Sequence, residues 1–228
     1  MSLADKAATA NGNNATILEN VDKVYESGRQ AEYDALWDAL QCKGTKTNYT
    51  YHFYTTAWTN SVFKPKYPFP KAGTFACAFQ GTGITNLSEY TFYVQIATSM
   101  FASSKIQEVG DIIIVSNTAA LSNMFSNCIS LKTIGHLTLY NDQTTNSISY
   151  SNTFTGCPKL ENIVIEGMIC KPINFAQSPL LTHDSLMSII NALSTTGNGQ
   201  KLTIGSTNIA KLTEDELAQI TAKGWTYA

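Results

Sequence analysis

The feature of this 228-residue chain that most constrains its fold is a stretch that occurs twice. The segment NMFSNCISLKTIGHL, residues 123–137, returns as NTFTGCPKLENIVIEG, residues 152–167. Repeats of this size bury an apolar side only against a neighbouring repeat, so the pattern predicts an array of stacked units. The two copies share a phenylalanine, a cysteine, a leucine and an isoleucine at equal spacing: Phe125, Cys128, Leu131 and Ile134, then Phe154, Cys157, Leu160 and Ile163.

Looser copies extend the predicted array over residues 73–181. Each begins with a phenylalanine, and the intervals between these anchors vary from 21 to 29 residues. Short runs of β-branched residues after the anchors predict strands. The anchors are Phe79, Phe101, Phe125, Phe154 and Phe175, and the clearest strands are expected at Asp111–Val115, His136–Leu139 and Asn162–Ile165.

The repeated cysteines are interpreted as packing groups. Cys128 and Cys157 stand three residues after an anchor phenylalanine, where other copies carry Thr82, Ser104 and Ser178. A position that accepts Cys, Ser or Thr requires a small side chain, whereas a nucleophile or a metal ligand would not tolerate this exchange. The five cysteines are odd in number and form no C-x-x-C pair, so we expect buried free thiols, with neither disulfides nor a metal site.

Residues 1–42 predict a disordered start followed by a helix. Apolar residues fall at helical spacing, and those from Ile17 to Ala35 alternate steps of four and three. Such a helix either packs on its own domain or forms a seam between copies in a homo-oligomer. The first residues contain no apolar stretch typical of a signal peptide, and no run approaches the roughly 18 residues that span a bilayer.

Residues 43–72 form an aromatic and lysine-rich segment. Tyr49, Tyr51 and Phe53 alternate with polar residues, which favours a strand. One interpretation is that these rings cap the open end of the array. The other is that exposed rings contact a ligand, and the candidate contact residues are Tyr49, Tyr51, Tyr54 and Trp58.

Residues 182–228 predict a helical C-terminal cap. Thr182 is placed to cap a helix, Lys201–Ile204 reads as a last strand, and Thr213 with Glu216 has the spacing of a capping box. The predicted fold is therefore α/β: a leucine-rich-repeat-like solenoid with an N-terminal helix and a helical C-terminal cap. Its sheet should display a face of Thr, Ser and Asn.

The pattern N-x-F-x-x-C-x-x-L-x-x-I, present as NMFSNCISLKTI and NTFTGCPKLENI, resembles the BspA-type leucine-rich repeat family. The blocks KVYESGRQAEYDALWDALQ and KGWTYA look similar to members carried by prophages and other mobile elements of gut bacteria. The resemblance covers about residues 73–205. It implies a repeat protein that presents a sheet to a ligand, on a phage particle or a bacterial cell surface.

Charge and motifs point away from several functions. The formal net charge is −2, and the single arginine, Arg29, disfavours nucleic-acid recognition. No nucleophile-elbow, zincin or P-loop pattern occurs, and His183-Asp184-Ser185 does not suit a triad because adjacent side chains diverge. We therefore expect a non-enzymatic binding or structural protein that mediates protein or glycan interaction, without cofactor or metal. The alternative is a carbohydrate-acting enzyme.

Overall fold

The computed structural model describes residues 30–54, 56, 58–142, 146–196 and 198–228. Most of the predicted N-terminal helical seam, including Ile17, lies outside these residues. Its last part forms α3 (Gln30–Leu40), which buries one apolar stripe at the i, i+3, i+4 and i+7 positions expected of an amphipathic helix. The stripe consists of Tyr33, Leu36, Trp37 and Leu40, and the short 3-10 turn η1 (Cys42–Gly44) ends the helical segment.

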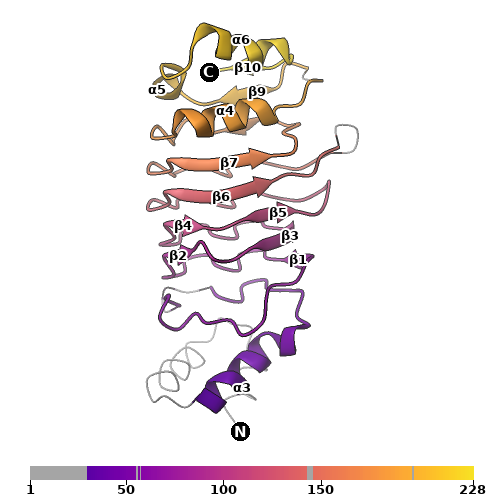
Figure 1. Ribbon diagram of the computed structural model, residues 1–228, viewed down its shortest axis with the longest axis vertical. Helices are drawn as coiled ribbons and strands as arrows, with labels where there is room; N and C mark the ends of the chain where they lie inside the picture. The colour runs from indigo at the N-terminus through magenta and orange to yellow at the C-terminus, as the bar shows by residue number, and fades with distance from the viewer. Residues whose placement is uncertain (1–29, 55, 57, 143–145, 197) are drawn as a thin grey trace.

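A parallel sheet of seven strands forms the front of the molecule (Figure 1). The strand order is β1-β3-β5-β6-β4-β2, and β7 adds to β6. Short strands suffice because each is covered by the strands above and below it. The strands are β1 (Gly73–Thr74), β2 (Asn86–Leu87), β3 (Phe92–Ile96), β4 (Glu108–Val109), β5 (Ile112–Ile114), β6 (Thr133–Thr138) and β7 (Asn162–Glu166).

The predicted α/β class is correct, but the predicted leucine-rich-repeat solenoid is wrong. Strand β6 pairs with β4 through Thr133 and with β5 through Leu137. Two arms of short strands, β2–β4 and β1–β3–β5, therefore merge at β6 into one parallel half-barrel sheet with few helices. The sequence located strands β5 to β7 well. It did not reveal the pairing, because repeats of unequal length do not each supply one equivalent strand.

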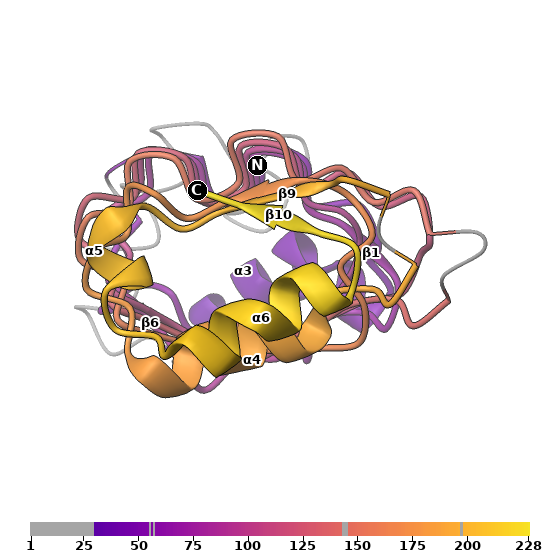
Figure 2. The same cartoon turned by 90° about the horizontal axis from the view of Figure 1, so that it is seen from above.

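A smaller parallel sheet and three helices close the C-terminal end (Figures 1 and 2). The predicted cap signals are confirmed: the Thr182 side chain accepts a hydrogen bond from Ser185 N, and Thr213 and Glu216 form a capping box. Viewed along the long axis, β6, α4 and α6 lie on one side and β9 and β10 on the other (Figure 2). The elements are β8 (Ile173–Asn174), α4 (His183–Ala192), β9 (Lys201–Thr203), α5 (Ser206–Ile209), α6 (Glu214–Ala222) and β10 (Thr226–Tyr227).

A column of stacked phenylalanine rings runs through the core, as the repeats predict. The rings of Phe101 and Phe125 lie 5.2 Å apart between centroids and those of Phe125 and Phe154 lie 5.8 Å apart, nearly parallel in both pairs. Both Phe125 and Phe154 are buried. The column also extends below residue 73, because Phe53 stacks on Phe79 at 5.0 Å. The aromatic segment therefore continues the packing of the repeats.

Behind each ring the main chain makes the same tight turn. The residue two positions before the phenylalanine has a positive φ, between 53° and 58°, in five successive turns. The strand predicted around Tyr49, Tyr51 and Phe53 is wrong for this reason: Tyr51, at φ 53°, starts such a turn. Asparagine tolerates this left-handed conformation better than most residues, which explains the N-x-F element of the repeat. The five residues are Tyr51, Cys77, Ser99, Asn123 and Asn152.

Main-chain hydrogen bonds tie successive turns together. Phe79 N donates to Met100 O at 2.8 Å, Phe101 N to Met124 O at 2.8 Å, and Phe125 N to Thr153 O at 2.9 Å. The turns thus form a parallel ladder of their own on the side opposite the main sheet. Since each donor meets the acceptor of the next turn, residues at equivalent positions are held in columns.

The column of small side chains is confirmed as buried. Cys128 and Cys157 are free thiols, and each Sγ donates a hydrogen bond of 3.0 Å to the carbonyl of an anchor phenylalanine in the turn below, Phe101 and Phe125 respectively. Thr82, Ser104 and Ser178 are buried in the same register. A larger side chain at this depth would collide with the adjacent turn, so the position selects size.

Side chains on α4 occupy the outer edge of β7. Ser185 Oγ accepts from Ile163 N at 3.0 Å and donates to Glu161 O at 3.1 Å. Ser188 Oγ accepts from Ile165 N at 3.2 Å. The two serines are three residues apart and share one helix face. They satisfy main-chain groups that an open edge strand would leave available for association with another chain.

A single asparagine satisfies main-chain groups beside β2, an edge strand at the opposite end of the main sheet. Asn60 Oδ1 accepts from Thr85 N at 2.8 Å and from Asn86 N at 3.2 Å, and Asn60 Nδ2 donates to Asn86 O. The side-chain amide of Asn60 thus takes the place of a main-chain peptide beside β2. The β2 and β7 edges are thus closed by different chemistry, an amide at one and hydroxyls at the other. Beside β1, the main chain continues the ladder instead, since Tyr49 N donates to Thr74 O at 2.8 Å and Thr74 N donates to Thr47 O at 3.0 Å.

Replacing Phe125 by alanine should lower the free energy of unfolding by about 3–5 kcal/mol, because a ring in the middle of the stacked column is removed. Denaturant melts measure this change. Ile129→Ala is the matched control, since Ile129 is 64% exposed and its truncation should cost less than about 0.5 kcal/mol. Equal effects of the two substitutions would contradict the column.

Ser185→Ala should destabilise the chain by about 1–3 kcal/mol, because Ile163 N loses its acceptor at a buried position. Ser151→Ala, at an exposed serine, is the control and should be nearly neutral. Amide hydrogen exchange adds a local measurement: the Ile163 amide should exchange faster in Ser185→Ala and at its usual rate in Ser151→Ala.

The two buried thiols should resist labelling in the folded protein, whereas the exposed Cys42 should react readily. Burial raises the pKa of Cys128 to about 11 and that of Cys157 to about 12. Because folding favours the protonated thiols, their stabilising contribution is complete below pH about 9 and is lost as pH rises through these folded pKa values. The slope is about 1.4 kcal/mol per pH unit for each thiol. A Cys128→Ser/Cys157→Ser variant should show a shallower alkaline decline.

Candidate binding faces

The outward side of the stacked turns, called here the turn face, carries no ionisable acid or lysine. It is formed by residues 74–82, 97–104, 116–130 and 146–157, in which Asp, Glu, Lys, Arg and His do not occur. Its accessible side chains offer hydroxyls and amides held in columns by the turn ladder. They include Thr98, Ser99, Ser103, Ser122, Asn123, Ser126, Asn127, Ser151, Asn152 and Thr155.

Two of the four predicted ligand-contact residues are buried. Tyr49 is 1% exposed and stacks on Phe75 at 5.3 Å, and Trp58 is fully buried against Phe53 at 5.2 Å. Their prediction as surface contacts is wrong, because both rings fill the N-terminal end of the aromatic column. The interpretation that aromatic residues of this segment pack under the array fits these two side chains.

Tyr51 and Tyr54, the other two, do reach the surface. Tyr51 is 46% exposed and Tyr54 is 41% exposed, and their rings meet edge to face at 5.9 Å. Tyr51 belongs to the positive-φ column, so the pair lies at the N-terminal end of the turn face. The Cys77 side chain in the next turn hydrogen-bonds to Tyr51 and raises the pKa of its phenol. Tyr51 therefore remains a neutral, amphipathic ring.

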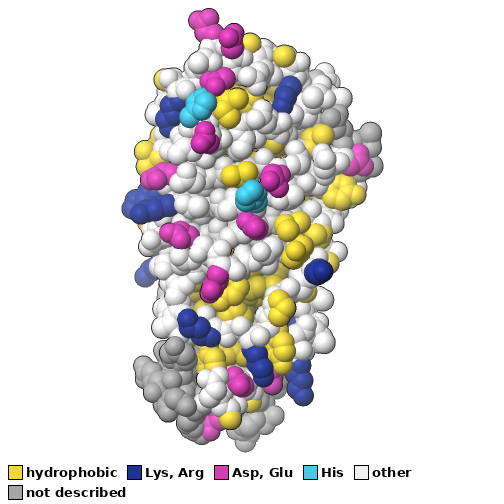
Figure 3. Space-filling model, in the orientation of Figure 1, with side chains coloured by type: hydrophobic (Ala, Val, Ile, Leu, Met, Phe, Trp, Pro, Cys, Tyr) yellow, Lys and Arg dark blue, Asp and Glu magenta, His cyan; other side chains and the backbone are white. Residues whose placement is uncertain are grey.

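The outward side of the main sheet, called here the sheet face, differs from the prediction. A surface of Thr, Ser and Asn was expected there, but acidic and basic side chains are spread over it (Figure 3). Along β6, His136 N donates to Asp111 Oδ1 at 2.9 Å, and His136 Nδ1 lies 2.9 Å from Glu166 Oε1. Thr138 Oγ1 donates to Glu166 Oε2 at 3.2 Å. The hydroxyl and amide surface lies instead on the turn face.

The carboxylates around His136 do not make a catalytic arrangement. Asp111 is engaged by a main-chain amide, and Glu166 by His136 and Thr138. The imidazole and the Glu166 carboxylate are each about half exposed, so water screens their interaction. Within the described residues, no three His, Cys, Asp or Glu side chains come together as a metal site would require.

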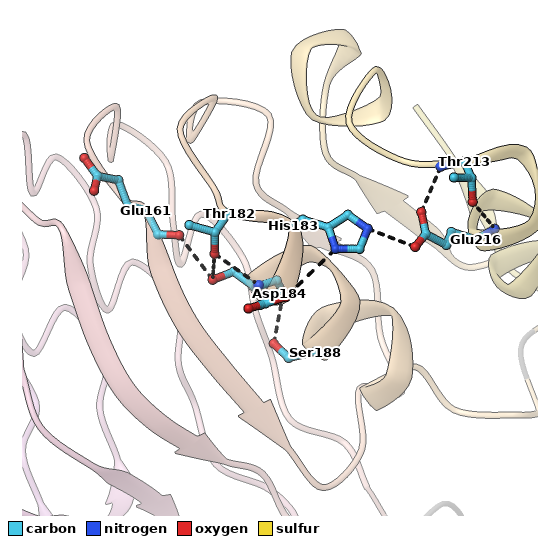
Figure 4. Close-up of polar contacts among 8 residues, drawn as sticks. Glu161, Thr182, His183, Asp184, Ser188, Thr213 and Glu216 are labelled. Carbon is cyan, nitrogen blue, oxygen red and sulfur yellow. Dashed lines mark hydrogen bonds and ion pairs between the residues drawn. The ribbon is translucent and has the colours of Figure 1, made fainter.

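The consecutive residues His183, Asp184 and Ser185 serve structural contacts (Figure 4). His183 Nε2 lies 2.9 Å from Glu216 Oε1, which joins the start of α4 to the start of α6. The capping hydrogen bond from Thr213 N, together with the contact to His183, lowers the pKa of Glu216. The Ser185 side chain hydrogen-bonds to the main chain at the edge of β7. The predicted divergence is wrong for the first two side chains, because His183 Nδ1 lies 3.9 Å from Asp184 Oδ1. No triad forms, since Ser185 Oγ is bonded to Ile163 N and Glu161 O instead.

A buried histidine supports the N-terminal end of the column. His52 Nε2 donates to Leu40 O at 3.0 Å, and the ring packs edge to face on Tyr49 and Phe53. Burial lowers the pKa of His52 to about 3, so the imidazole is neutral at physiological pH. Burial likewise raises the pKa of Tyr49 to about 12. Neither side chain is available to a ligand.

Comparison with known proteins leaves the family open. No protein-family model, curated protein or solved structure matches the chain. In the part of the chain that the structure describes, the helices are too short or too polar to cross a membrane. The function has to be argued from the geometry of the two faces.

One sequence signal for the turn face lies outside the predicted repeats. Tyr51 stands two residues before Phe53, as Asn123 and Asn152 stand two residues before Phe125 and Phe154. Reading Tyr51-x-Phe53 as one more copy of N-x-F would have placed Tyr51 in the outward, positive-φ column. The same reading would have placed Phe53 in the core.

Proposed function

We propose that the protein is a non-enzymatic binding protein whose turn face contacts a protein or glycan ligand. The observation that carries the proposal is an uncharged surface of columns of hydroxyl and amide groups, with the exposed Tyr51–Tyr54 ring pair at its end. Hydroxyl and amide groups both donate and accept hydrogen bonds, so they suit a neutral polar ligand. Exposed tyrosines add contact area at low entropic cost.

Rigidity supports the same proposal. The turns are fixed by main-chain hydrogen bonds and by the ring column beneath them, so ligand binding does not have to order the main chain that carries the contact residues. Each contact is small, and many copies on one surface would add avidity. The resemblance to BspA-type repeats suggests such a setting, a phage particle or a bacterial cell surface. A seam between copies through residues 17–35 remains a proposal for how copies would cluster.

The test is a screen of the purified chain against a glycan array and a panel of host surface proteins. A Tyr51→Ser/Tyr54→Ser variant should weaken binding of any ligand found by about tenfold or more, because loss of two aromatic contacts removes at least 1.4 kcal/mol. Val164→Ser is the control, since Val164 is 41% exposed on β7 of the main sheet, on the side opposite the turn face.

Two results would contradict the proposal. Binding that is unchanged in the Tyr51→Ser/Tyr54→Ser variant would move the contact away from the turn face. Turnover of a glycan, lost in Glu166→Gln or Asp111→Asn, would instead establish the carbohydrate-acting enzyme. Both substitutions keep the size of the side chain and remove only the carboxylate.

A further inference from the structure

A cavity of about 450 Å³ opens where the proline-rich connection crosses the lower edge of the sheet face. One wall comes from Pro68, Phe69 and Pro70, and the other from Tyr90 and Tyr93 at the start of β3. Hydrophobic side chains gather on this lower half of the sheet face (Figure 3). The volume falls within the range of pockets that hold small organic ligands.

The proline-rich wall is held rigidly from behind. Gln41 is buried, and its amide donates to Tyr67 O at 2.7 Å and accepts from Tyr67 N at 2.8 Å. Tyr67 Oη donates to Asp38 Oδ1 at 2.7 Å, and Lys66 pairs with the same carboxylate at 2.7 Å. Four contacts from α3 and its end thus fix a segment that has no strand or helix of its own. A preformed wall reduces the entropic cost of binding.

The other wall is fixed by ring packing. Tyr90 meets Phe63 edge to face at 5.6 Å and Phe69 at 6.1 Å. Burial raises the pKa of Tyr90, with a further contribution from the neighbouring Glu89, so the phenol stays neutral. Tyr93 is only partly buried, and it points outward from β3 opposite Ile113. Tyr93 therefore presents a ring to the cavity without being part of the core.

The polar groups of the lining balance in charge. Lys71 and Glu89 are exposed at the rim, one cation and one anion, and Thr91 adds a hydroxyl. Such a lining offers donors and acceptors with no net charge, so it favours neither an anion nor a cation. Aromatic faces beside a few polar groups match the alternating apolar and hydroxyl faces of a sugar ring.

We propose that this cavity, between the proline-rich connection and β3, binds one or two rings of a neutral oligosaccharide. Tyr93 stacks on the sugar, and Lys71 and Glu89 hydrogen-bond to its hydroxyls. The proposal goes beyond the turn-face function and does not rest on it, because the two sites share no residue. An extended proline-rich peptide, which also docks on aromatic-lined grooves, is the competing occupant that the test separates.

The experiment is calorimetric titration of the full chain with neutral hexasaccharides of α-linked glucose, β-linked glucose and N-acetylglucosamine. A decaproline peptide is titrated in parallel. At least one hexasaccharide should bind, and Tyr93→Ala should weaken that binding by about tenfold or more. Tyr93→Phe keeps the ring and should retain most of the affinity. Because Tyr93 is partly exposed, thermal melts of both variants should remain close to that of the parent chain.

The matched controls separate this site from the turn face. Tyr51→Ser/Tyr54→Ser and Tyr227→Ala should leave hexasaccharide affinity unchanged. The proposal is overturned if no hexasaccharide binds, if only decaproline binds, or if Tyr93→Ala binds as well as the parent. A loss in Tyr51→Ser/Tyr54→Ser with no loss in Tyr93→Ala would support the turn face and refute the cavity.

Discussion

The structure depends on one constraint, an in-register parallel ladder of main-chain hydrogen bonds. On the front, the ladder joins β1 to β7. On the back, it joins the turns that precede and follow each anchor phenylalanine. In a parallel ladder, equivalent residues of successive units lie over one another, apart from register shifts between β1 and β3 and between β6 and β7. One favourable side chain is therefore selected again in each unit. The phenylalanine column, the small Cys/Ser/Thr column and the positive-φ column all follow from this geometry. The sequence repeat therefore follows from the register of these main-chain hydrogen bonds.

The sequence predicted the buried side chains more completely than it predicted which strands pair with each other. Phe125, Phe154, Cys128 and Cys157 were correctly predicted as buried, because burial leaves a periodic apolar pattern. The half-barrel was not predicted, since the joining of two strand arms on β6 depends on partners more than 20 residues away. The same holds for the contact of Asn60 with Asn86 and that of Ser185 with Ile163, which span 26 and 22 residues respectively. The four predicted contact residues form a buried pair and an exposed pair for a related reason. Alternating aromatics at 49–53 suggested a strand, but the left-handed conformation of Tyr51 turned its side chain outward and left Tyr49 and Trp58 inside.

The distribution of charge separates the molecule into two surfaces with different capacities. The sheet face holds charged groups in paired contacts, such as Asn86 with Glu108 and His136 with Glu166. The turn face holds neutral groups only, over the ranges that define it. A ligand that approaches the turn face meets no desolvation penalty for buried charge, and salt should affect its binding little. The cavity beside Tyr93 lies on the sheet face, yet its own lining carries one cation and one anion and so has no net charge. The two proposed sites could therefore be occupied at the same time.

The closure of the β2 and β7 edges by unlike side chains limits how the main sheet can be extended. An array whose ends matched each other could add further copies head to tail without limit, since each new copy would continue the ladder and present a fresh edge. Here the β2 edge ends on the amide of Asn60, and the β7 edge ends on a helix whose serines occupy the strand's main-chain groups. At both of these edges, the main-chain groups that would pair with a strand of another copy are already bonded. The main sheet is thus finite at these two edges, although its repeated motif alone could grow as a fibre.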